Sequence, residues 1–305
     1  SQLLSFTLNE GISAEDVLNR SEAELKSVQL EMLDLAVPLY EKIFGYPPEI
    51  RSHDEHLNVI EKVLDSIADD HVDRHEVVES ARATIDELNQ FIMDKDLLTL
   101  DPTKPLEIRE TPEYQRGFSI ASLQAPGPLE DNLQTYYNVS PIPNDWTEKE
   151  SESFLREYNR ISVKILSIHE ALPGHYVQLY YANRHPSIIR SVLGSGVMVE
   201  GWAHYTERMM IEEGFGDGDP RYKLVQMKWK LRGIANAIID QKIHAGKMTE
   251  DEAMELMVKE TFQEEAEASA KWRRAQLSFG QLSTYFVGST LMWDLKRDVE
   301  EKWGS

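Results

Sequence analysis

The chain has 305 residues, enough for one large domain or two small ones, and 41% of them are hydrophobic, so a substantial core needs no covalent cross-links. It contains no cysteine, which excludes disulfides and cysteine-ligated zinc; any bound metal must sit on His, Asp or Glu. The 53 acidic residues outnumber the 32 basic ones, and the formal charge of −21 disfavours nucleic acid and anionic membrane surfaces as partners.

The sequence contains no segment that suggests membrane insertion. No apolar run approaches the roughly 20 residues of a membrane-spanning helix. The first residues have neither the basic start nor the long apolar stretch of a signal peptide. We therefore expect no membrane insertion and leave a cytoplasmic or a periplasmic location open. The oligomeric state is open as well.

Residues 1–105 form the predicted N-terminal helical part. Between Ser13 and Leu98, apolar residues recur at spacings of three and four, as expected for amphipathic helices. Residues 106–144 form a small β and loop segment in which 106–110 and 135–139 alternate like strands between Pro and Gly clusters. An exposed edge strand at 135–139 could hydrogen-bond an extended peptide, although a structural hairpin explains the same pattern slightly better.

Residues 145–305 form the predicted helical catalytic part, continuous with the rest of the chain. Thr147 and Glu150 match a capping box, and the following helix is expected to bury a stripe that ends at His169. Further helices are expected over 197–213, 222–244, from a second capping box at Thr249, and over 282–301. The fold is therefore expected to be mainly α, with a small β-hairpin or sheet insertion.

The segment from His169 to His175 carries the densest chemistry. Its two histidines are six residues apart, and Glu170 follows the first. On a straight helix a six-residue step leaves the two imidazoles roughly 120° apart around the axis. A shared metal therefore requires a break between them, and Pro173 and Gly174 stand at that place. His–Glu pairs also occur without any metal, so this segment alone does not establish a site.

A second polar stripe lies about 30 residues further on. Glu200, His204 and Glu207 fall on one helical face at i, i+4 and i+7. A carboxylate on a separate helix at this distance from a His-Glu motif is the usual third ligand in zinc peptidases of the glutamate type. A solvated acidic face is the alternative interpretation of the same pattern.

Five phrases, in order over more than half of the chain, resemble the bacterial domain-of-unknown-function 885 family. They are 155–159, 169–178 (HEALPGHYVQ), 199–207 (VEGWAHYTE), 231–240 with His244 following, and 281–288 (QLSTYFVG). The family resembles gluzincin metallopeptidases, which implies a multi-helix, zincin-like fold of the oligopeptidase and carboxypeptidase type. Family members are often longer at the N-terminus, so this chain is expected to be a C-terminal catalytic portion.

The resemblance implies roles for the matching residues. His169, His175 and Glu200 would bind one Zn²⁺ per chain, and Glu170 would accept the proton of the attacking water. Tyr285 would donate a hydrogen bond to the oxyanion, although an ordinary buried tyrosine is as good an interpretation. His204 stands where related enzymes carry an acidic residue; it would orient a ligand or contact substrate.

Three further residues are weaker candidates. Asp240 and His244 form an i, i+4 pair that suits either a supporting role at the metal or a plain structural link. Arg274 could meet a peptide carboxylate, but a surface arginine is the simpler interpretation.

These residues lead us to expect a zinc-dependent metallopeptidase that hydrolyses short peptides. A metal-binding scaffold without catalysis is one alternative, and a zinc hydrolase of esters or non-peptide amides is another. Two histidines and a carboxylate can also hold iron, so the choice of zinc rests on ligand type and on the resemblance.

Overall fold

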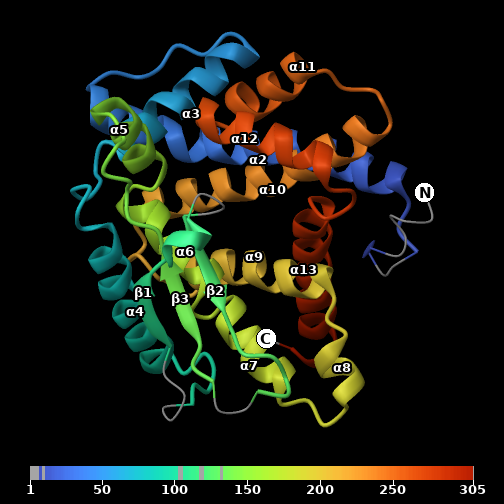
Figure 1. Ribbon diagram of the computed structural model, residues 1–305. Helices are drawn as coiled ribbons and strands as arrows, with labels where there is room; N and C mark the ends of the chain where they lie inside the picture. The colour runs from blue at the N-terminus through green and yellow to red at the C-terminus, as the bar shows by residue number, and fades with distance from the viewer. Residues whose placement is uncertain (1–6, 9–10, 102–105, 117–119, 131–132, 305) are drawn as a thin grey trace. The chain divides into compact units, whose positions relative to one another are not determined.

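A computed structural model describes residues 7–8, 11–101, 106–116, 120–130 and 133–304, which are mainly helical with one small sheet (Figure 1). The chain divides into two compact units. The first comprises residues 1–69, 195–201 and 219–305, and the second comprises 70–194 and 202–218. Helix α9 (Gly196–Glu212) contributes residues to both units. None of the described helices is long and apolar enough to cross a membrane.

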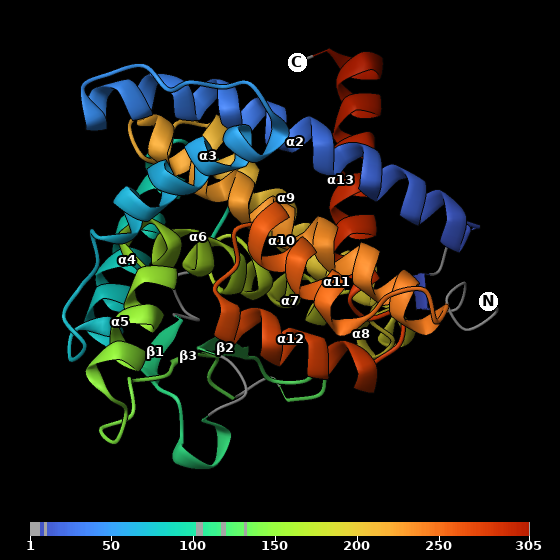
Figure 2. The same cartoon turned by 90° about the horizontal axis from the view of Figure 1, so that it is seen from above.

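The first unit is helical and is organised around α10 (Pro220–His244), which packs against four other α-helices and a π-helix of this unit. Most residues of α10 from Leu224 to Asp240 are buried, as expected for a helix with neighbours on several sides. Figure 2 shows this group of helices from above. The other elements of the unit are α2 (Ala14–Phe44), α3 (His53–Ala68), α11 (Glu250–Glu255), the π-helix η2 (Leu256–Glu260), α12 (Glu265–Leu277) and α13 (Ser283–Trp303).

Asp240 connects α10 to the turn before α13. Its buried carboxylate accepts hydrogen bonds from the backbone N–H groups of Gly280 and Ser283, both at 3.0 Å, and from the Ser283 hydroxyl at 2.7 Å. His244 lies 3.7 Å from Asp240, and its Nε2 contacts the carbonyl of Ser278 at 2.7 Å. Asp240 and His244, the i, i+4 pair noted in the sequence, thus form a structural link between α10 and the segment after α12.

Helices α9 and α13 meet backbone to backbone at Gly201 and Gly288. A Cβ added at Gly201 would lie 2.4–2.6 Å from the backbone of Gly288. A Cβ added at Gly288 would lie 2.1 Å from the carbonyl oxygen of Val197. Only glycine fits at either position, so this crossing sets the place of the α9 residues next to it, including Glu200.

The second unit carries the sheet and the helices that pack on it. The sheet has the order β1-β3-β2, with β1 parallel and β2 antiparallel to the central strand. Both α4 and α6 contact the sheet and each other. The elements are α4 (Val77–Asp94), β1 (Glu107–Glu110), the 3₁₀ helix η1 (Glu113–Gln115), β2 (Ala121–Gln124), β3 (Tyr136–Val139), α5 (Glu148–Glu157), α6 (Arg160–Glu170), α7 (His175–Asn183) and α8 (Ile188–Val192).

The sheet confirms the predicted β segment, but the suggested edge strand at 135–139 is wrong. β3 pairs with β1 on one side and with β2 on the other, so its backbone groups are already used in the sheet. Its side chain Tyr137 is almost fully buried, and its hydroxyl lies 3.1 Å from the Ser167 hydroxyl on α6. The central strand therefore supports the helix that carries His169.

The capping boxes at Thr147 and Thr249 are confirmed. The single helix expected after Thr147 is instead two. α5 ends at Glu157, and Asn159 caps α6 by accepting hydrogen bonds from the N–H groups of Ile161 and Ser162, at 3.2 and 3.1 Å. An asparagine is among the best N-cap residues, so it starts a new helix here.

The glycine crossing leads to a stability prediction. Gly288→Ala is expected to lower the free energy of unfolding by about 1–3 kcal/mol, because the new methyl group would collide with backbone atoms that cannot rotate away. Denaturant unfolding would measure the change. Gly11→Ala is the matched control, since among the described residues, its chain neighbours aside, no atom lies within 4 Å of its added Cβ. Equal effects of the two substitutions would contradict a tight crossing.

Candidate metal centre

The helix that carries His169 breaks before His175, as the sequence predicts. α6 ends at Glu170 and α7 begins at His175, with a cis peptide bond between Leu172 and Pro173 in the turn between them. The N–H of Gly174 donates to the carbonyl of Ile168 at 2.9 Å, six residues back. This hydrogen bond spans six residues and replaces the i→i−4 hydrogen bonds of a regular α-helix at that point.

Gly174 leaves no room for a side chain. An added Cβ would lie 1.8 Å from the carbonyl oxygen of His169 and 2.3 Å from that of Ile168. The neighbouring Pro173 carbonyl accepts a hydrogen bond from the indole Nε1 of Trp202 on α9, at 2.9 Å. The turn is thus held by its own backbone on one side and by α9 on the other.

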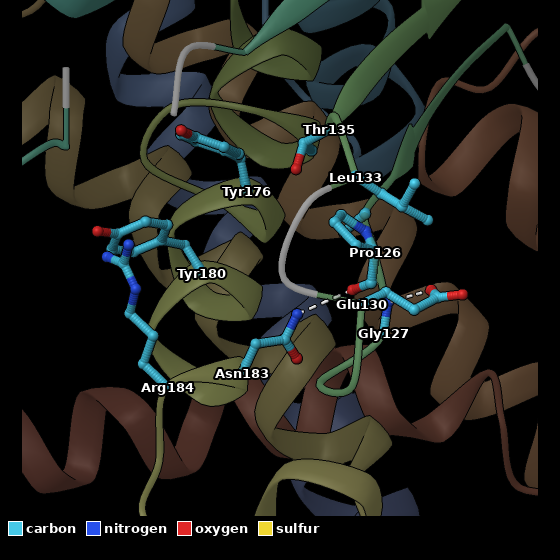
Figure 3. A pocket seen from close by; sticks show the side chains of 10 residues that line it. Pro126, Gly127, Glu130, Leu133, Thr135, Tyr176, Tyr180, Asn183 and Arg184 are labelled. Carbon is cyan, nitrogen blue, oxygen red and sulfur yellow. Dashed lines mark hydrogen bonds between the residues drawn. The ribbon is translucent and has the colours of Figure 1, made fainter. Parts of the chain in front are cut away.

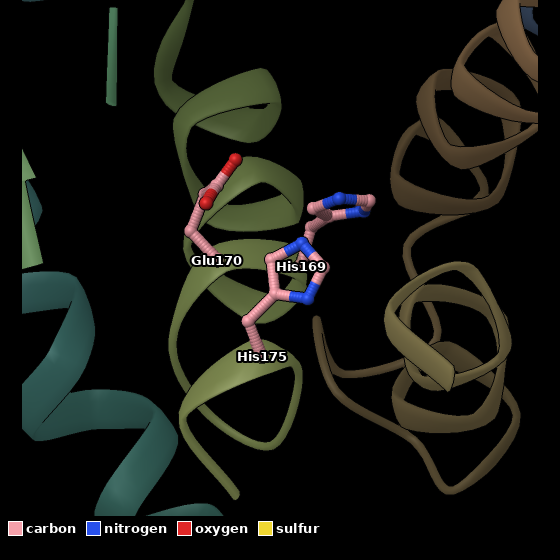
Figure 4. A group of neighbouring side chains, drawn as sticks. All are labelled: His169, Glu170 and His175. Carbon is pink, nitrogen blue, oxygen red and sulfur yellow. The ribbon is translucent and has the colours of Figure 1, made fainter. Parts of the chain in front are cut away.

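The break brings the two histidines together. Their ring centroids are 4.8 Å apart, with the planes at 85° (Figure 4). One nitrogen of His169, one of His175 and a carboxylate oxygen of Glu170 all lie within 4.8 Å of one another. A straight helix would have kept the two rings on different faces. The predicted neighbourhood of these three residues is therefore present.

Glu207, on α9, is the buried partner of this cluster. Its side chain is 0% exposed, and its Oε1 lies 2.7 Å from Nδ1 of His169 and 3.0 Å from Nδ1 of His204. Burial alone would raise the pKa of Glu207, but the charge of His204 and the hydrogen bonds from both histidines lower it to about 2. Glu207 is thus ionised at neutral pH.

The negative charge of Glu207 determines which ring nitrogen of His169 and of His204 carries a proton. An ionised carboxylate can only accept, so both Nδ1 atoms must donate. When such a ring is neutral, its lone pair is on Nε2, which is then the atom able to bind a metal. Metal-ligating histidines commonly donate their other N–H to a carboxylate in this way. The arrangement suits His169 as a ligand.

Sequence reasoning placed Glu207 on the face of Glu200 and His204 but assigned it no role. The structure places both Glu207 and His204 beside His169, and the three residues form a second group whose ligand atoms lie within 4.8 Å of one another; the direct hydrogen bond of His169 is to the Glu207 carboxylate. His204 is held by the same carboxylate, and its ring centroid lies 4.9 Å from that of His169. The available signal was the i+7 spacing from Glu200. A helical face alone could not reveal which of its residues meets His169.

The remaining predicted residues lie in the first unit. Glu200 is one turn before His204 on α9, and Tyr285 is on α13. The Tyr285 hydroxyl accepts hydrogen bonds from Arg274 at 3.2 Å and from Gln281 at 3.1 Å. Arg274 also donates to the side-chain oxygen of Gln281 at 2.9 Å. The roles of Glu200 as third ligand and of Tyr285 as hydrogen-bond donor to substrate stay predictions.

The donor atoms of this cluster suit a borderline divalent metal. Two imidazoles with carboxylates nearby, and no thiol in the chain, match the ligands found in catalytic zinc sites. The protein is thus mainly helical and contains a candidate metal centre. This centre consists of His169 and Glu170 before the break in the helix, His175 after it, and the buried carboxylate of Glu207 beside His169.

The whole chain, residues 1–305, matches the model of a family of bacterial proteins of unknown function (DUF885), and it therefore belongs to this family. A solved structure from Shewanella oneidensis, described as a lipoprotein of unknown function, is 42% identical with a TM-score of 0.89. That match covers 100% of this chain and 54% of the other. A search of curated proteins finds no match.

A second solved structure, described as a lipoprotein from Colwellia psychrerythraea, is 18% identical with a TM-score of 0.81. It covers 99% of this chain and 49% of the other, and at this identity the likeness shows the fold alone. The chain thus spans about half the length of both solved proteins.

Gly174→Ala tests the turn between the histidines. The substitution is expected to lower the free energy of unfolding by at least about 2 kcal/mol, because the added methyl group cannot fit beside the His169 carbonyl. The affinity for added Zn²⁺ is expected to fall by at least about tenfold, since the rings would move apart. Urea unfolding and a competitive zinc titration measure the two effects. Wild-type values in both, with Gly11→Ala as control, would disprove the steric requirement.

Glu207→Gln tests the buried charge. The folded-state pKa of Glu207 lies below the ordinary value of 4.5, so its stabilising contribution is present above pH 4.5 and is lost as the pH falls towards 2. The shift corresponds to a contribution on the order of 3 kcal/mol. The stability difference between wild type and Glu207→Gln should therefore shrink between pH 5 and pH 3. Urea unfolding of chelator-treated protein measures it, and a difference constant over that range would refute the lowered pKa.

Proposed function

We propose that the chain is a zinc-dependent metallopeptidase that hydrolyses peptide bonds in short peptides. The observation that carries the proposal is the cluster of His169, Glu170 and His175, in which His169 is held through Nδ1 by the buried Glu207. A carboxylate beside two adjacent imidazoles provides both metal ligands and a proton acceptor within one turn of chain.

His169 and His175 would each supply an imidazole nitrogen, and Glu200 would supply a carboxylate oxygen. This donor set is the one that gluzincin-type zinc peptidases use. When bound there, zinc would lower the pKa of a water molecule towards ~7 and polarise the substrate carbonyl. Glu207 would keep His169 in the tautomer and the orientation that binding requires.

Glu170 would accept the proton of the attacking water and later deliver it to the leaving amine. Burial, and in addition the charge of Glu170, raises the pKa of Tyr137, so this tyrosine stays protonated beside Ser167. Tyr285 would donate a hydrogen bond to the oxygen that gains negative charge as the peptide carbonyl is attacked.

Wild type, His169→Ala and Glu170→Gln should be compared for bound metal and for hydrolysis. Elemental mass spectrometry on protein purified without chelator is expected to find about one zinc per wild-type chain and little in His169→Ala. Glu170→Gln is expected to keep its zinc and fold, and to lose at least about 10²-fold in turnover of a short-peptide pool.

The outcomes separate the proposed steps. Turnover retained in zinc-loaded Glu170→Gln would reject Glu170 as the proton acceptor. If the protein binds zinc and cleaves esters or other amides but no peptide, the proposed substrate bond would be wrong and the metal-dependent hydrolysis would stand. A wild-type chain that takes up no zinc, with its fold intact by circular dichroism, would remove the proposed mechanism.

A further inference from the structure

Trp202, on α9, binds the turn between the two histidines of the candidate metal centre. Its indole Nε1 donates to the carbonyl of Pro173 at 2.9 Å. The side chain is partly buried, and the centre of its ring lies 5.7 Å from that of Tyr205, about one turn further along α9. An indole N–H can only donate a hydrogen bond, so any part that Trp202 has in the metal centre acts through this carbonyl.

The carbonyl of Pro173 belongs to the turn that places His175. Gly174 comes next, and its N–H donates to the carbonyl of Ile168 at 2.9 Å. α7 begins at His175, directly after Gly174. A peptide unit is planar, so a hydrogen bond that fixes the Pro173 carbonyl also fixes the orientation of the N–H of Gly174. The start of α7, and with it His175, is thus held from α9.

The other end of α7 is anchored as well. The Asn183 amide Nδ2 donates to the carbonyl of Pro126 at 2.8 Å, in the loop after β2 (Figure 3). The Tyr180 hydroxyl and the Arg184 guanidinium donate to the same carboxylate oxygen of Asp101, at 2.8 and 2.9 Å. A helix of nine residues that is bound at both ends has little freedom to slide or rotate. The side chain at its start is therefore held in place.

A second contact from α9 holds the first histidine. The buried carboxylate of Glu207 accepts the Nδ1–H of His169 at 2.7 Å. Trp202 and Glu207 are five residues apart on α9, roughly 7.5 Å along its axis. One helix therefore holds both histidines, His169 directly and His175 through Pro173. All of these residues lie in the second unit.

The separation that these contacts maintain suits one metal ion. The ring centroids of His169 and His175 are 4.8 Å apart. Two imidazoles on one tetrahedral zinc have centroids about 5 Å apart, given Zn–N distances of 2.0–2.1 Å. Loss of a group that supports a metal ligand typically lowers metal affinity by about 10–100-fold. The hydrogen bond from Trp202 is such a support, given to the backbone before a ligand rather than to its ring.

We propose that Trp202 is a positioning residue of the metal centre. By holding the Pro173 carbonyl, it keeps the turn in the form that sets the distance between His169 and His175. The inference rests on the proposed function, because it concerns the same zinc ligands. The contacts between α9 and the turn involve only the protein's own groups, so the turn forms without zinc and zinc binding does not have to reorganise it.

Trp202→Phe tests the contact, since it keeps an aromatic ring and removes the indole N–H. Its affinity for Zn²⁺ in a competitive titration is expected to fall by at least about tenfold. The visible absorption of the Co²⁺-loaded protein should change as well, because these bands report the arrangement of the metal ligands. Trp146→Phe is the matched control, since Trp146 is partly buried in the same unit and packs against Phe154. The control should keep the wild-type affinity and absorption.

Amide hydrogen exchange of residues 171–176, followed by mass spectrometry, tests the turn in chelator-treated protein. In wild type this exchange is expected to be at least about 10²-fold slower than in an unstructured peptide, because the N–H groups of the turn are already bound. In Trp202→Phe it should be at least about threefold faster than in wild type, since one supporting hydrogen bond is lost. The wild-type measurement needs no folded variant.

The outcomes separate this proposal from the proposed function. If Trp202→Phe matches its control in zinc affinity and cobalt absorption, Trp202 has no positioning role, and the peptidase proposal stands. Exchange of residues 171–176 at the unstructured rate in chelator-treated wild type would also overturn the inference. Zinc binding that Trp202→Phe weakens, in a protein that hydrolyses no peptide, would support the positioning role and reject the peptidase proposal. A wild type that takes up no zinc would overturn both.

Discussion

The carboxylate of Glu207 is fully buried and accepts Nδ1–H hydrogen bonds from His169 and His204 through one oxygen. A buried charge of this kind is costly unless its partners are close, so α6 and α9 must meet where the two imidazoles can reach it. The same contact fixes the tautomer of both rings and leaves each Nε2 as the atom that can accept a metal or a proton. The chemistry proposed for this protein depends on that constraint.

The turn between α6 and α7 depends on backbone atoms in a comparable way. Gly174 is surrounded by the carbonyls of Ile168 and His169, and Pro173 is bound by the indole of Trp202. These contacts leave the chain one route from His169 to His175. The distance between the two rings is therefore determined by the backbone of a few residues rather than by adjustable side chains.

Local features could be predicted from the sequence because neighbouring residues determine them. The capping boxes at Thr147 and Thr249 join residues three apart, and the break at Pro173 and Gly174 follows from a missing donor and a missing Cβ. The helix start at Asn159 was also within reach, since an asparagine N-cap is a local signal, but the continuous apolar stripe suggested one helix.

The candidate site was only partly predictable. His169, Glu170 and His175 are close in sequence, and one turn brings them together. Glu207 contacts His169 although the two residues are 38 positions apart in the sequence. Likewise, β3 is the central strand because β1 and β2 pair with it on either side. Periodicity assigns a residue to a face but does not say what that face meets. The sequence alone determined helix caps, helix breaks and helix faces, because these depend on local hydrogen bonds and sterics. Only tertiary packing decided which buried histidines contact the carboxylate of Glu207.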